Sequence, residues 1–307
     1  MAPSMFASLP LCIFVVIWTF ATAIRVGDDP DTNSSSTNSL LEFDPVGPPP
    51  PPLPGSRLMG GFDPPPFKYG FMGVLIRGRS YFCSATLIHD RFALTAAHCV
   101  DSMFRDYKVL LGINKVDDEA KTAQVIPVAE VFQRKWYRMD PLKEDLAILK
   151  LEKLATINKY VFPISIAPYG PHEGMAVTIL GFGETTRGFF RFSSLQAGYT
   201  KVFSFQVCQK IFPFIMKDMF CVKGSARTCI GDAGGPAIHQ GKLVGIASFG
   251  PIGCKRHYPR GFAHIHQFQG WIFNIVSTHD KSGSNYPSSD VYVLLALLLV
   301  LLVRRRW

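Results

Sequence analysis

The chain has 307 residues, of which 48% are hydrophobic and 18% charged, and its formal net charge is +9. This length and apolar content suffice for one large or two small packed cores. Although the chain is basic, its sequence contains no nucleic-acid-binding motif, so a nucleic acid is not an expected partner.

The N-terminus predicts a secretory signal peptide. Residues 6–20 are mostly apolar, and Ala21-Thr22-Ala23 follows them as an A-x-A cleavage pattern. No Lys or Arg precedes the apolar run, and a retained membrane anchor is the alternative interpretation. We therefore expect residues 1–23 to be removed as the chain enters the secretory pathway.

Residues 24–57 form an acidic, propeptide-like segment of low complexity. It has five acidic and two basic residues, a Ser/Thr/Asn run at 33–39 and a proline run at 48–54. Such a stretch cannot bury enough apolar surface to fold alone, and its prolines favour the extended polyproline II conformation. Asn33 begins an N-glycosylation sequon. A plain linker is the alternative interpretation of this segment.

Residues 58–278 have the pattern of an all-β domain. Short apolar stretches rich in Val, Ile and Phe recur between Gly, Pro, Asp and Asn, with no alternation of strands and helices. A closing helix is predicted at 268–276. Residues 58–281 carry 27 basic and 17 acidic side chains, an excess of ten positive charges. Such a surface could bind an anionic glycan or membrane surface, or it is an ordinary solvated surface.

The C-terminal residues predict a membrane tether. A polar stalk, 279–290, precedes thirteen consecutive apolar or aromatic residues, 291–303, and then three arginines. As a helix, thirteen residues span about 20 Å, less than the roughly 30 Å of a bilayer core. A GPI-attachment signal, with small residues at 282–285, and a short transmembrane helix are the two main interpretations of 291–307. A buried C-terminal segment, and hence a secreted protein, is the third.

Three short motifs follow one another along residues 58–278. They are Thr-Ala-Ala-His98-Cys, Glu-Asp145-Leu-Ala-Ile-Leu and Gly231-Asp-Ala233-Gly-Gly-Pro. They resemble the motifs that carry the catalytic histidine, the orienting aspartate and the nucleophile in the chymotrypsin/trypsin family of serine proteases, in that family's order. The resemblance covers nearly all of 58–278. It implies two six-stranded antiparallel β-barrels with the active site between them and a short C-terminal helix.

The cysteines suggest disulfides. Cys12 leaves with the signal peptide, and an even number, six, remains. In an oxidising compartment six cysteines favour three disulfides, for which spacing alone leaves 15 pairings. The family resemblance implies the pairs Cys83–Cys99, Cys208–Cys221 and Cys229–Cys254.

The resemblance also implies a triad that lacks its nucleophile. His98 and Asp145 would be the base and its orienter, and the N–H groups of Gly231 and Ala233 would form the oxyanion hole. Ala233 has no hydroxyl, and losing only the serine of an analogous triad lowers kcat about 10⁶-fold. The sequence therefore predicts a pseudoprotease, not an enzyme, that binds or modulates an extracellular protein partner or an active protease. A glycan- or surface-binding adhesion module, and an active endopeptidase with another nucleophile, are the alternatives.

Two further regions are interpreted through the family. A trypsin-like protease would cut after Arg57, and the new N-terminus at Leu58 would pair with Asp232. The alternative is that Arg57 stays uncut. Arg227 would lie at the base of the primary specificity pocket, with Ser248 and Gly250 at its edge. The predicted activation site is therefore Arg57, Leu58 and Asp232, and the predicted specificity pocket is Arg227, Ser248 and Gly250. An arginine at the base would repel basic side chains and would either fill the pocket or accept an acidic one.

No cofactor and no metal are expected. The positions that carry calcium ligands in calcium-binding family members are Ile113 and Ala123 here. His264 and His266 would lie on one face of a strand, as a metal pair or as solvent-exposed or core histidines.

Overall fold

The computed structural model describes residues 58, 60–78, 80–101, 106–116, 120–140, 142–183 and 194–280. These residues belong to one compact unit, which begins at Pro50. The predicted signal peptide, the acidic segment with Asn33 and Arg57, most of the stalk, and the apolar tail lie outside the described residues.

Six strands close the N-terminal barrel. They are β1 (Met72–Arg77), β2 (Ser80–His89), β3 (Phe92–Thr95), β4 (Tyr107–Leu111), β5 (Gln124–Gln133) and β8 (Ala147–Leu151). Their order around the barrel is β1-β2-β3-β8-β5-β4, and every neighbouring pair is antiparallel. Aliphatic and aromatic side chains, which suit a pleated surface, fill the interior; Val74, Phe92 and Leu149 are fully buried.

A second group of six strands closes the C-terminal barrel. They are β9 (Ala176–Gly181), β10 (Gln196–Phe203), β11 (Met219–Lys223), β12 (Pro236–His239), β13 (Lys242–Phe249) and β14 (Arg260–His264), in the order β10-β11-β14-β13-β12-β9. All neighbours are again antiparallel. The predicted fold of two six-stranded barrels is confirmed. A small hairpin, β6 (Arg138–Met139) with β7 (Leu142–Lys143), extends from the N-terminal barrel.

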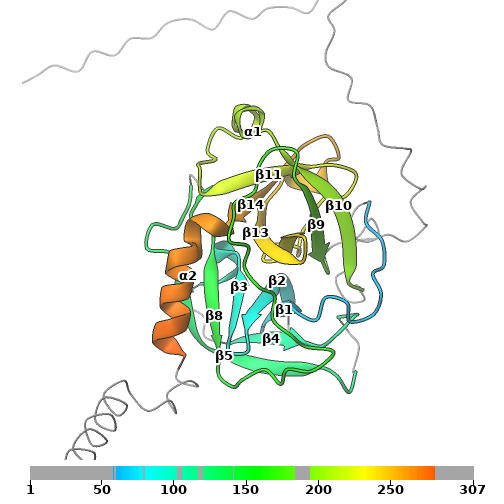
Figure 1. Cartoon of the computed structure of the whole chain (residues 1–307), viewed down its shortest axis with the longest axis vertical. Helices are drawn as coiled ribbons and strands as arrows, with labels where there is room; N and C mark the ends of the chain where they lie inside the picture. Colours follow the sequence, from blue (N-terminus) through cyan, green and yellow to red (C-terminus); the bar gives the residue numbers. More distant parts are fainter. Residues whose placement is uncertain are drawn as a thin grey trace, which may run out of the picture. The chain divides into compact units, whose positions relative to one another are not determined.

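The closing helix α2 (Ile265–His279) is longer than the predicted 268–276. It runs beside the N-terminal barrel, although it follows the last strand of the C-terminal one (Figure 1). Phe268 and Ile272 are buried in an apolar cluster to which both barrels contribute, and the Arg134 guanidinium lies over the Phe268 ring at 5.4 Å. The helix therefore holds the two barrels together.

The remaining helices are short. The α-helix α1 (Phe205–Ile211) was not predicted, and two 3₁₀ turns, η1 (Ala97–Cys99) and η3 (Ile252–Cys254), complete the described elements. No helix among the described residues is long and apolar enough to cross a membrane.

The structure contains the three disulfides that the family resemblance implied, Cys83–Cys99, Cys208–Cys221 and Cys229–Cys254. Their Cα–Cα distances are 6.2, 6.4 and 5.3 Å. Disulfides form and persist in oxidising compartments, so these bonds are consistent with folding in the secretory pathway.

Two adjacent residues of α2 provide a test of its packing. Ile272 is fully buried, whereas the Phe273 side chain is 53% exposed. We expect Ile272→Ala to lower the free energy of unfolding by about 2–5 kcal/mol, because it leaves a cavity in the core. Phe273→Ala should change it by less than about 0.5 kcal/mol. Chemical denaturation measures both, and equal losses would show that α2 is not packed as described.

Candidate active site

His98 and Asp145 form a two-point contact. The His98 backbone N–H donates to Asp145 Oδ1 at 2.9 Å, and His98 Nδ1 lies 2.8 Å from Asp145 Oδ2. The Asp145 side chain is fully buried, whereas that of His98 is 26% exposed. An ionised carboxylate only accepts hydrogen bonds, so Nδ1 carries the proton and the tautomer is fixed. This geometry agrees with the roles predicted for His98 and Asp145, a base and its orienting group.

Local backbone geometry directs Asp145 inward. Glu144, just before it, has a φ of 50°, which a non-glycine residue adopts only at some cost. Two contacts hold Glu144 there: its N–H donates to Asp218 Oδ2 at 2.7 Å, and its carboxylate pairs with Arg134 Nε at 3.1 Å. These contacts stabilise the turn that places the Asp145 carboxylate beneath the imidazole.

The Asp145 carboxylate also binds Ser248. The Ser248 hydroxyl donates to Oδ2 at 2.5 Å. Burial alone would raise the pKa of Asp145, but the hydrogen bonds and charge of His98, together with the Ser248 hydroxyl, hold the pKa below its usual value. Asp145 is therefore ionised at neutral pH. Ser248 faces this carboxylate, so its hydroxyl is part of the orienting network.

The nucleophile loop, residues 231–235, is held against the N-terminal barrel. The Ser84 N–H donates to the Ala233 carbonyl at 2.7 Å, and the hydroxyls of Ser84 and Tyr81 both donate to the Gly231 carbonyl at 3.1 Å. Gly234 has a φ of 87°, and a Cβ there would overlap the Ser84 carbonyl oxygen. The loop conformation thus depends on contacts from β2.

Two backbone donors of this loop have no acceptor. Within the described part of the chain, neither the N–H of Gly231 nor that of Ala233 donates a hydrogen bond. Ala233 is partly exposed and lies in the position that the sequence assigned to the nucleophile. Its methyl group offers no oxygen, so no acyl-enzyme can form at this side chain.

Asp232 is buried and differs from Asp145 in its surroundings. Its Oδ1 accepts the Gly183 N–H and its Oδ2 accepts the Cys229 N–H, each at 2.7 Å. Burial raises the pKa of Asp232 to about 7, against the opposing effects of the two N–H groups and of Arg260. A Cβ on Gly183 would overlap Oδ1, so glycine is needed for this close approach.

The N-terminus at Leu58 is the predicted partner of Asp232, and the structure describes Leu58 but not Arg57 before it. The Leu58 side chain is 1% exposed and packs in the apolar core of the C-terminal barrel, beside Ala226. Arg57 lies outside the described residues, so its cleavage and an ammonium–carboxylate pair remain predictions.

The place of Arg227 at the base of a pocket stays a prediction, and sequence reasoning missed a residue next to Gly250, Arg260. Arg227 Nε donates to the Cys254 carbonyl at 2.9 Å, and burial, followed by the charge of Arg256, lowers the pKa of Arg227. Arg260 is 2% exposed and lies against Gly250. A basic residue at the start of an otherwise apolar strand was the only signal in the sequence.

The two histidines do not share a strand face as expected, because His264 ends β14 and His266 lies in the first turn of α2. The rings of His264 and His266 are 6.3 Å apart, and burial lowers the pKa of His264. Among the described residues, one group of side chains meets the spacing of metal ligands, namely Cys83, His98 and Cys99, but both sulfurs belong to a disulfide.

The Trypsin family model matches residues 58–272. Human kallikrein-8 is 29% identical over 72% of this chain and 87% of its own length. Mouse kallikrein 1-related peptidase b27 is 32% identical over 71% of this chain and 89% of its own. The solved structure of neuropsin, a serine protease expressed in the limbic system of mouse brain, is 29% identical, with a TM-score of 0.65 over 70% of this chain and 98% of neuropsin. The chain belongs to the trypsin family of serine proteases.

These comparisons correct one prediction. The sequence was interpreted as a non-enzyme on the basis of Ala233 alone. The relatives are kallikreins and trypsins, and the structural match is a serine protease, so the chain is classed with the proteases. What Ala233 changes is confined to one atom, the missing hydroxyl oxygen, because the fold and the His98–Asp145 pair are retained.

The pKa of Asp232 predicts a pH dependence of stability in the chain uncut at Arg57. The folded-state pKa, about 7, lies above the ordinary value of 3.8, so the folded state binds the proton more tightly. This contribution is present at low pH and is lost as pH rises from about 4 to about 7, by at most on the order of 4 kcal/mol. We expect Asp232→Asn to remove this downward slope. Unfolding free energies measured from pH 4 to 8 test it, and parallel curves for the two proteins would contradict it.

Proposed function

We propose that the chain is a cell-surface, extracellular member of the trypsin family that binds an extended segment of a protein partner. The binding surface would be the junction site, which consists of His98, Gly231, Ala233, Phe249 and Gly250. The observation that carries this proposal is that, among the described residues, the N–H groups of Gly231 and Ala233 have no acceptor, together with the assembled His98–Asp145 pair. Such donors suit the carbonyl oxygen of a bound peptide.

The end of β13 offers a backbone edge to the same peptide. In the ladder with β12, β13 is paired only as far as Ile246, whereas with β14 its pairing continues to Phe249. Residues 248–250 therefore have one edge without a strand partner among the described residues. An extended peptide can add to such an edge through main-chain hydrogen bonds, with its side chains supplying specificity.

An aromatic cluster beside this edge suits apolar side chains. The Phe249 ring lies 5.1 Å from that of Phe212 and 4.9 Å from that of Phe214, and Leu142 packs against the same cluster. These side chains are partly exposed. Aromatic surfaces of this kind contribute strongly to peptide binding, because they bury large apolar areas.

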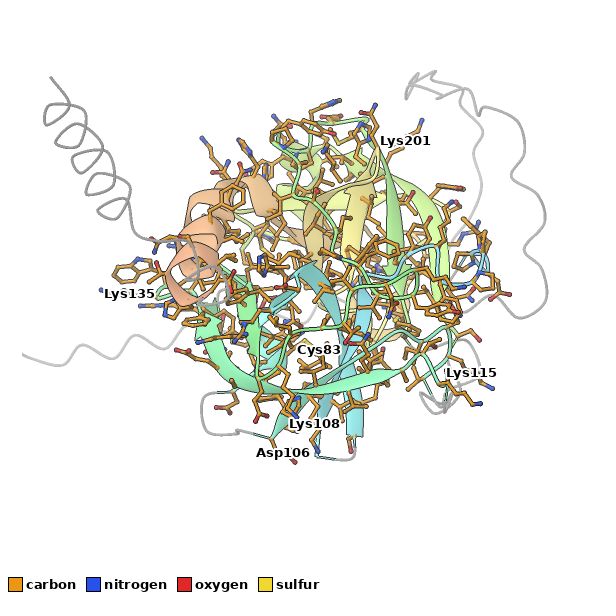
Figure 2. The ribbon with its side chains drawn as sticks, turned by 60° about the horizontal axis from the view of Figure 1, so that its bottom comes forward. Cys83, Asp106, Lys108, Lys115, Lys135 and Lys201 are labelled. Carbon is orange, nitrogen blue, oxygen red and sulfur yellow. A yellow bond between two sulfur atoms is a disulfide. The ribbon has the colours of Figure 1, made fainter. Side chains whose placement is uncertain are left out.

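The proposed location at the cell surface is based on residues 291–307. The apolar residues 291–303 and the arginines after them support a tether to the outer cell surface, by a GPI anchor or a short transmembrane helix. The adhesion alternative lacks a comparable observation. The lysines labelled in Figure 2, Lys108, Lys115, Lys135 and Lys201, project from different sides of the molecule, so they do not form one anionic-ligand surface.

Restoring the hydroxyl tests the proposal. The native chain and Ala233→Ser, each cut after Arg57 and kept in detergent, would be compared on one broad peptide library for binding and for cleavage. We expect both to bind a common set of peptides. Ala233→Ser should cleave that set faster by several orders of magnitude, because it restores the nucleophile to a site that keeps the His98–Asp145 pair and the two N–H groups.

His98→Ala in the Ala233→Ser background is the control. It should abolish the added cleavage and leave peptide binding in place. If neither the native chain nor Ala233→Ser binds peptides, the junction site is not a peptide site and the proposal is wrong.

A further inference from the structure

Arg260 is a buried cation bound only to neutral groups. Its Nε donates to the Thr228 carbonyl at 2.8 Å, its Nη1 to the carbonyls of Tyr258 at 3.1 Å and Pro259 at 3.4 Å, and its Nη2 to that of Lys255 at 3.1 Å. No ion pair of the described residues includes Arg260. Arginine is almost never fully buried without a charged partner, so this position needs an explanation.

The side chain of Arg260 lies between the Thr228 carbonyl and the Gly250 backbone, where the family resemblance implies the primary pocket. Thr228, whose carbonyl it binds, directly follows Arg227, and the charge of Arg227 contributes to lowering the pKa of Arg260. A Cβ placed on Gly250 would be 2.6 Å from Arg260 Cδ and 3.0 Å from Arg260 Nε. The stem of Arg260 therefore occupies the space beside the Gly250 backbone.

The Arg260 guanidinium is held in place by its hydrogen bonds to four backbone carbonyls. Burial, followed by the charge of Arg227, lowers the pKa of Arg260 to about 10, while Asp232 opposes this shift, so the group stays charged at neutral pH. Moving it aside would leave four carbonyl groups without their donor and would expose the pocket to a second cation, Arg227. Buried groups that lose such partners pay their full desolvation cost, so the closed arrangement is the stable one.

We propose that Arg260 determines the specificity of the junction site by filling the primary pocket from within. A peptide would then bind by its backbone along β13 and by apolar side chains on the cluster of Phe212, Phe214 and Phe249, with none of its side chains in the pocket. This account of the peptide rests on the proposed function, whereas occupancy of the pocket by Arg260 can be tested separately.

Small aromatic ions test the occupancy. The full chain, cut after Arg57, would be titrated with benzoate and with benzamidine, and binding followed by ligand-detected NMR and calorimetry. The native chain should bind neither. Arg260→Gly should open the pocket above Arg227 and bind benzoate at least tenfold more tightly than benzamidine, because the remaining cation attracts the carboxylate. Adding Arg227→Asp to this variant should reverse that preference.

Arg256→Gly is the matched control. Arg256 lies in the exposed turn that precedes β14, so this substitution removes the same kind of side chain and charge without opening the pocket. It should bind neither ion. Saturable binding of either ion by the native chain would overturn the proposal, as would a folded Arg260→Gly that binds neither.

Gly250→Ala provides a test that does not require the Arg260 variant to fold. The added methyl group would press on the stem of Arg260, so we expect the melting temperature of the native chain to fall by at least about 2 °C. An unchanged melting temperature would mean that Arg260 does not lie against Gly250.

If the native chain binds peptides but also binds benzoate, the pocket proposal fails and the proposed function stands. If the ions behave as expected but no peptide binds, the pocket proposal stands and the proposed function fails.

Discussion

The docking of the nucleophile loop onto β2 is the contact on which the rest of the site depends. Four groups of β2 donate to carbonyls of that loop: the Ser84 N–H and the hydroxyls of Tyr81, Ser84 and Thr86, the last to Gly234 at 3.0 Å. His98 comes from the N-terminal barrel and Ala233 from the C-terminal one. Their relative position is therefore set by these hydrogen bonds and by α2, which crosses from one barrel to the other.

Two buried carboxyl groups in the same site differ in charge for a simple reason. Asp145 receives hydrogen bonds from an imidazole and a hydroxyl, and these outweigh its burial. Asp232 receives two backbone N–H groups and is the more completely buried, so burial prevails and its pKa rises to about 7. The site thus has one permanent negative charge beneath His98 and one acid whose charge depends on pH and on any cation that reaches it.

The fold and the central pair could be predicted because they are carried by short, contiguous motifs. His98, Asp145 and the six paired cysteines are each recognisable from their neighbours in the sequence. The bounds of α2 were harder to predict, because His264, at its start, makes no side-chain capping hydrogen bond and the strand β14 continues directly into the helix. The role of Arg260 was missed because its four acceptors come from residue 228 and from 255–259, which only the folded chain brings together. The prediction of a non-enzyme was wrong because it depended on Ala233 alone. The whole domain, residues 58–272, matches the trypsin family.

The disulfide Cys229–Cys254 has a mechanical consequence for the pocket. Two of the carbonyls that bind Arg260 belong to Thr228 and Lys255, the residues immediately outside its two cysteines. The covalent bond thus clamps the two chain segments between which the guanidinium is held. A thiol reagent that opened this bond would release the clamp on the guanidinium, so the closure of the pocket depends on Cys229 and Cys254 being oxidised.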